Sequence, residues 1–151
     1  MASGYRPAAE PHTFFFARRG EPVPLRTRLG PRGVLLEMAH YCEIVPRQRD
    51  SHEVRTPSYW YRLLDRQEHE LLAYHWHPEG VSPITFPHLH LSSQVRPIAI
   101  GPGADPVALA EMHLPTGQVT LADIVRLLIT EFAVQPRRDD WETVLQENLA
   151  R

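Results

Sequence analysis

Apolar and polar residues alternate along several short segments in the middle of the chain, which is the pattern of strands that bury one face. Residues 34–46, which follow Gly33 and end at Pro46, are long enough for a strand or a helix, and we favour the strand. Residues 58–65 and 69–77, rich in Tyr and Trp, flank a polar triplet at 66–68 and predict the two strands of a hairpin. The middle of the chain therefore predicts β structure.

Two later segments have a less regular pattern. Residues 84–91 alternate, but Pro87 has no amide hydrogen to donate, so we expect this strand at a sheet edge or at a bulge. Residues 107–115 fit either a strand or a helical turn, and we favour the strand. The polar residues 47–55 predict a loop before the hairpin.

Near the end of the chain the hydrophobic period changes from two to about 3.6 residues, which predicts helices. Thr120 can cap a helix over residues 121–132, with Asp123 three residues after the cap. Pro136 separates this helix from a second one that begins near Asp139. The two apolar stripes consist of Leu121, Ile124, Val125, Leu128 and Phe132, and of Trp141, Val144, Leu145 and Leu149.

All the predicted strands precede the two predicted helices. Such segregation favours an α+β fold, an antiparallel sheet of about four to five strands with the two C-terminal helices packed on one face. At 151 residues the chain has the length of one ordinary domain. We assign residues 34–151 to this single domain, and residues 1–33, rich in Pro, Gly and Arg, to an N-terminal arm.

Composition narrows the class of protein. The contents of 42% hydrophobic and 23% charged residues are those of a globular protein. No apolar run approaches the ~20 residues that cross a bilayer, and the apolar stretch near the N-terminus is too short for a secretory signal. We therefore expect a cytoplasmic protein with no membrane partner. The single cysteine, Cys42, lies in an apolar stretch and predicts a buried, inert thiol.

Histidine is the residue type that suggests chemistry. In an extended segment alternate side chains share a face, so His75 and His77 point one way, and His88 and His90 likewise form a pair. If the two strands are neighbours, four imidazoles converge, and His113 is a fifth candidate. Imidazole suits zinc, copper, iron or nickel, and three such ligands with an open position can activate water. One interpretation is thus a divalent transition-metal site, with zinc as an example.

Two other interpretations of the same histidines stay open. Imidazole near its own pKa moves protons, so the two pairs can perform acid/base chemistry on a phosphodiester without a metal. Alternatively, the rings only complete the core through hydrogen bonds. In a catalytic site a carboxylate such as Glu79 or Glu111 can add a ligand or a base. The candidate catalytic residues are His88, His90, His75 and His77, and the candidate metal ligands are these four and His113.

Residues 87–95 resemble the His-x-His-x-His motif of histidine-triad nucleotide hydrolases. Ser92 stands at the third histidine position, however, and Ser93-Gln94 replace the apolar pair that follows in that family. This departure leaves the motif without its third histidine, so the resemblance covers only part of the family's pattern.

From Ser58 onward, the order of features resembles the TumE-type toxins of bacterial and archaeal toxin-antitoxin pairs. An aromatic hairpin, a polar turn, Thr-Phe-Pro-His with a further histidine and a C-terminal helix follow one another over residues 58–132. His88 fits the first histidine of the family's Phe-Pro-His-His-x-His run, Leu89 stands in place of its middle histidine, and His90 is the further histidine that follows. The resemblance implies a small toxin that acts on RNA and that an antitoxin encoded beside it blocks.

Three functions follow from these patterns. The leading hypothesis is a TumE-like toxin, or a domesticated relative, whose histidines line a site for phosphodiester acid/base chemistry on RNA. The second is a histidine-ligated metal-binding protein or metalloenzyme. The third is a non-catalytic interaction module with structural histidines. In it the arm of residues 1–33 binds a partner protein, or binds a second copy of the chain and forms a homo-oligomer.

Overall fold

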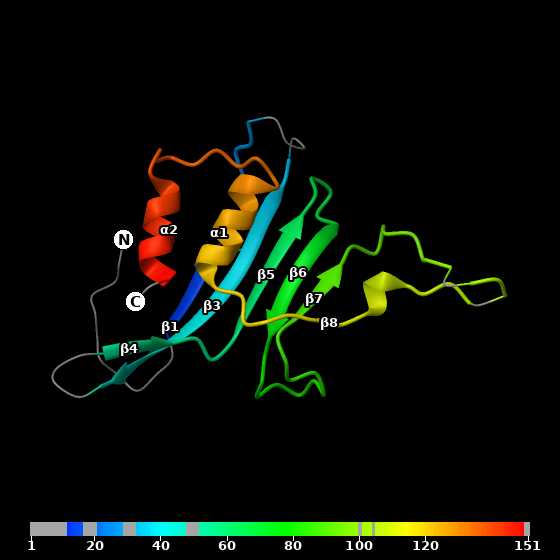
Figure 1. The fold of residues 1–151 in the computed structure, drawn as a ribbon, viewed down its shortest axis with the longest axis horizontal. Helices are drawn as coiled ribbons and strands as arrows, with labels where there is room; N and C mark the ends of the chain where they lie inside the picture. Colours follow the sequence, from blue (N-terminus) through cyan, green and yellow to red (C-terminus); the bar gives the residue numbers. More distant parts are fainter. Residues whose placement is uncertain are drawn as a thin grey trace.

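A computed structural model describes residues 12–16, 21–28, 33–47, 52–99, 101–103 and 105–149. Within these ranges the chain forms one antiparallel sheet in the order β1-β3-β5-β6-β7-β8, and β2 and β4 also pair with β3 (Figure 1). The strands are β1 (His12–Phe16), β2 (Val23–Pro24), β3 (Leu35–Pro46), β4 (His52–Arg55), β5 (Tyr59–Leu64), β6 (Glu70–Trp76), β7 (His88–Leu91) and β8 (Leu114–Pro115). The helices are the 3-10 helix η1 (Leu109–Glu111), α1 (Leu121–Thr130) and α2 (Trp141–Leu149).

The antiparallel α+β class with two C-terminal helices is confirmed, but the expected strand number of four to five was wrong, since the described sheet has 8 strands. The additional strands depend on β3, which is 12 residues long and offers pairing positions along its whole length. β1 and β2, from within the segment assigned to the arm, pair with it, and β4 lies where a loop was expected. Strands of two to five residues are too short to give a clear alternation.

The long strands separate the sheet into two faces, one of which is covered by α1 with α2 packed beside it (Figure 1). Every second residue of β3 and β5 points to this side, because side chains alternate along a strand. Tyr59 and Tyr61 stack there with ring centroids 4.8 Å apart. The buried core consists of Val34, Leu36, Met38, Tyr59, Tyr61, Leu63, Ile124 and Leu128.

Both helices begin close to the residues that the apolar stripes predict. The Thr120 side chain accepts a hydrogen bond from the backbone N–H of Asp123 at 3.1 Å, and the Thr120 backbone N–H donates to the Asp123 carboxylate at 2.9 Å. This reciprocal pair satisfies two amides of the first turn and fixes where α1 begins. None of the described helices is both long and apolar enough to span a membrane.

The less regular segments were predicted only in part. Residues 107–115 contain the 3-10 helix η1 and the two-residue strand β8, so the strand expected over this segment forms only at Leu114–Pro115. β7 pairs with β6 on one edge and with β8 on the other, so its expected edge position was wrong. Pro87 immediately precedes β7, and the strand therefore loses no hydrogen-bond donor inside its ladder.

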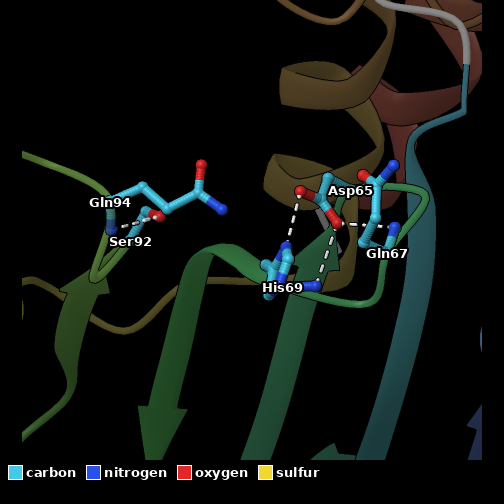
Figure 2. A network of polar contacts seen from close by, with 5 residues as sticks. All are labelled: Asp65, Gln67, His69, Ser92 and Gln94. Atoms are coloured by element: carbon cyan, nitrogen blue, oxygen red, sulfur yellow. Dashed lines mark hydrogen bonds and ion pairs between the residues drawn. The ribbon is translucent and has the colours of Figure 1, made fainter.

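Short polar turns fix the ends of the strands that carry the histidine pairs. In the β5–β6 turn, Asp65 Oδ1 accepts hydrogen bonds from the backbone N–H groups of Gln67 and His69 at 2.8 and 2.9 Å (Figure 2). After β7, Ser92 Oγ accepts from the backbone N–H of Gln94 at 3.1 Å (Figure 2). Ser92 is buried, and its position in place of a third histidine is thus part of the turn that ends the strand.

Gly33 gives a direct test of the turn that leads into β3. Its φ is +98°, which is strained for any residue with a Cβ, and a Cβ there would overlap the side chain of Arg66. We expect Gly33→Ala to lower the free energy of unfolding by about 1–2 kcal/mol in urea denaturation. Gly117→Ala is the matched control, because its Cβ would meet no atom within 4 Å. Equal stability of the two variants would contradict this account of the turn.

Candidate functional site

Register places the two His-x-His pairs beside each other. His75 on β6 is directly opposite His88 on β7, and Ala73 is opposite His90. Because residues two apart share a face, His75, His88 and His90 project from one side of the sheet. Leu72 and Tyr74 point to the other side, where they pack against the core under α1. The histidines therefore lie on the face opposite the helices.

The imidazole rings are close to one another. The His75 ring centroid is 5.7 Å from that of His88 and 5.0 Å from that of His90, and the His88 and His90 centroids are 4.9 Å apart. Each of the three residues offers a nitrogen, and these nitrogens all lie within 4.8 Å of one another. Among the described residues, this group of potential metal ligands contains histidine alone; neither Glu79 nor Glu111 belongs to it.

His113 and His77 flank this group on different sides. The ring of His113 is 4.6 Å from His90 and 5.0 Å from His88, and the residue is solvent-exposed just before β8. The ring of His77 is 6.1 Å from His75. We use the name histidine cluster for His75, His88, His90 and His113, with His77 at its margin.

His88 is the most firmly held member of the cluster. Its residue surface is 6% exposed, and its Nδ1 lies 2.9 Å from the backbone carbonyl oxygen of Phe86. A carbonyl oxygen only accepts hydrogen bonds, so Nδ1 carries a proton, and in the neutral ring the lone pair is on Nε2. A metal-binding histidine in proteins is commonly oriented by this kind of second hydrogen bond.

The surroundings favour the neutral form of three of the five rings. Burial, followed by the neighbouring rings of His90 and His88, lowers the pKa of His75 to about 4. Burial and the nearby His113 lower the pKa of His90, and burial with the nearby His88 lowers that of His77. At neutral pH these imidazoles are unprotonated and can donate a lone pair.

A group of charged side chains, which the sequence did not reveal, lies beside the cluster on the same face. Arg62 is opposite Ala73, in the row of residues that ends at His90. Its guanidinium donates to Glu37 at 2.9 Å and to Glu70 at 3.1 Å. Two carboxylates and one guanidinium leave a net formal charge of −1; the Glu70 carboxylate favours a cation at His90, whereas the Arg62 guanidinium helps to lower the pKa of His75. Glu37 and Arg62 are 25 residues apart, so only the strand pairing brings them together.

An apolar groove of about 610 Å³ lies on the other face, between β1 and the helices. Phe14, Met38 and Trp141 are among the residues that line it, and no member of the histidine cluster does. The groove and the cluster are thus separate features of the sheet, and only the cluster brings together groups with proton-transfer or metal-binding chemistry.

The lowered pKa of His75 predicts how the stability of the metal-free protein depends on pH. The pKa of His75 is about 6.5 in the unfolded chain and about 4 in the folded protein. The neutral ring's contribution to the free energy of unfolding is therefore complete above pH 6.5 and is lost as the pH falls to about 4. The loss is up to about 3 kcal/mol. Urea denaturation of wild type and His75→Gln between these pH values measures it, and the variant should show a flatter profile. Parallel profiles would contradict the burial of a neutral ring.

Comparison with protein-family models, with curated proteins and with solved structures finds no match for this chain. The resemblance to TumE-type toxins stays a prediction, carried by the residues of the sequence alone. The function of the histidine cluster therefore has to be inferred from the chemistry of its own side chains.

Proposed function

We propose that this protein binds a divalent transition-metal ion, such as zinc, through His75, His88 and His90. The observation that carries the proposal is the mutual approach of three ring nitrogens within 4.8 Å on two paired strands. Strand-borne side chains are held more rigidly than those of loops, which suits a preorganised metal site. Imidazole is a common ligand of zinc, copper, iron and nickel.

The spacing of the nitrogens is close to what tetrahedral zinc requires. Zn–N bonds of about 2.0–2.1 Å place ligand nitrogens about 3.4 Å apart, so modest rotations of the three rings close the site. His88 already presents Nε2 with its lone pair, and the net charge of −1 from Glu37, Arg62 and Glu70 offsets part of the ion's charge.

Three histidine ligands leave a fourth coordination position for water. In such sites the metal lowers the pKa of the bound water to about 7 and makes hydroxide available at neutral pH. His113 is exposed and adjacent to His90 and His88, so its imidazole would lie beside a water at that position. The arrangement supports metal-assisted hydrolysis as the reaction class.

Metal-free acid/base catalysis fits the same cluster less well. A general acid must be protonated at the working pH, and the pKa of His75 near 4 keeps that ring neutral at pH 7. The pKa values of His77 and His90 are also lowered. A ring that holds no proton near neutrality is a weak acid/base catalyst but a ready metal ligand.

Zinc titration of protein purified without a His-tag tests the proposal. We expect about one equivalent to bind in calorimetry, and the melting temperature to rise because the ion binds only the folded chain. His75→Gln and His90→Gln should weaken zinc binding by at least about 100-fold, because removing a direct ligand costs at least as much affinity as removing a residue that only orients a ligand. His69→Gln, which changes an exposed histidine bonded to Asp65, is the control. Zinc binding as tight as that of the wild type in both His75→Gln and His90→Gln would contradict the proposed site.

We propose as a second candidate a TumE-like toxin that acts on RNA in the cytoplasm and is blocked by an antitoxin protein. The observation that favours it is that His88, which fits the family's run, and His90, the further histidine after it, both belong to the cluster. A metal-bound hydroxide would serve hydrolysis of a phosphodiester as well as of other substrates, so the two proposals share one site.

Growth of a related bacterial host after induction tests the second candidate. We expect growth arrest with the wild-type chain, and normal growth with His88→Ala or His90→Ala if circular dichroism shows that the variants are folded. His69→Gln should still arrest growth, because this residue lies outside the cluster. Wild-type growth equal to that of the empty vector would count against a toxin.

A further inference from the structure

A pocket of about 310 Å³ lies next to the histidine cluster. Its walls come from parts of the chain that are distant in sequence: Tyr41 from β3, Ser58 from the residue before β5, and His77 and Glu79 from the turn after β6. Pro57 and Pro78 give it rigid apolar surfaces. The volume is at the lower end of the range for small-molecule sites.

Register places this pocket on the same face as the cluster, one row of residues further along the strands. Trp60 is directly opposite His75, and Ser58, two residues before Trp60, projects to the same side. The backbone N–H of Tyr41 donates to the carbonyl of Ser58 at 3.1 Å, which holds β3 and β5 together at this row. His77 joins the two features, because it lines the pocket and its ring is 6.1 Å from that of His75.

The charge of the pocket restricts what it can hold. Of the seven described residues that line it, only Glu79 carries a formal charge at neutral pH. The hydroxyl groups of Tyr41 and Ser58 add hydrogen-bonding capacity without charge. A carboxylate or phosphate would meet an uncompensated negative group in this pocket, whereas an ammonium group would meet a partner.

We propose that this pocket is the substrate subsite of the metal centre and takes a small organic amine, whose ammonium group pairs with Glu79 while its other end reaches the metal. The inference rests on the proposed function, since the metal at His75, His88 and His90 supplies the reacting position. It adds a substrate class and a specificity-determining residue, Glu79, that metal binding alone does not imply.

A matched pair of chelating probes tests the pocket: 6-aminohexanohydroxamate, which carries an ammonium group, and hexanohydroxamate, which does not. Both bind zinc through the hydroxamate, so their difference reports the ammonium contact. We expect the zinc-loaded wild-type protein to bind the amine about fivefold more tightly in calorimetry, the effect of one solvent-accessible ion pair. Glu79→Gln should abolish the preference and leave zinc affinity unchanged. Glu142→Gln, which changes an exposed carboxylate on α2 at the opposite face, should keep the preference.

The outcomes separate the two proposals. Normal zinc binding with equal affinity for the two probes, or a preference that survives Glu79→Gln, overturns the amine subsite and leaves the metal centre standing. Failure of the wild-type protein to bind zinc overturns both. A preference that both carboxylate variants lose equally would show a general effect of charge and also overturns the assignment to Glu79.

Discussion

The antiparallel pairing of His75 with His88 is the constraint on which the candidate site depends. Packing on the other face of the sheet fixes this register. There Tyr74 pairs with Leu89, and both side chains point away from the histidines. A slip of β7 by one residue would turn His88 and His90 toward the helices and Leu89 toward solvent. The apolar residues under α1 thus determine where the imidazoles lie, and the packing of one face positions the chemistry of the other.

Partial burial then selects the form in which the imidazoles act. Rings that stand close together on a sheet repel as cations and lose hydration, and both effects favour the neutral ring, as the pKa of His75 near 4 indicates. Neutral rings with free lone pairs are poor proton donors and good metal ligands. The ion-paired group of Glu37, Arg62 and Glu70 adds a net charge of −1 beside the cluster, which offsets part of the charge of a divalent ion.

The sequence predicts those elements whose signals lie within a few neighbouring residues of the chain. The hairpin around Asp65 and the helix capped by Thr120 both have periodic residues next to clear turn or cap signals, and the structure contains both. β1, β2 and β4 were not predicted, and only the end of the strand expected over residues 107–115 forms, as β8, because strands of two to five residues obtain their stability from the neighbours they pair with. For the same reason the ion pair of Arg62 with Glu37 and the pocket at Tyr41 and Glu79 require the strand order, which no spacing along the chain reveals.

X-ray absorption at the zinc edge tests the central claim, that the sheet holds a metal through three imidazoles. The zinc-loaded protein should show about three imidazole nitrogens and one oxygen at about 2.0–2.1 Å from the metal. No sulfur should contribute, because Cys42, the single cysteine, is buried on β3 away from the cluster. A spectrum with a sulfur neighbour, or with water oxygens and fewer than two imidazoles, would contradict the account.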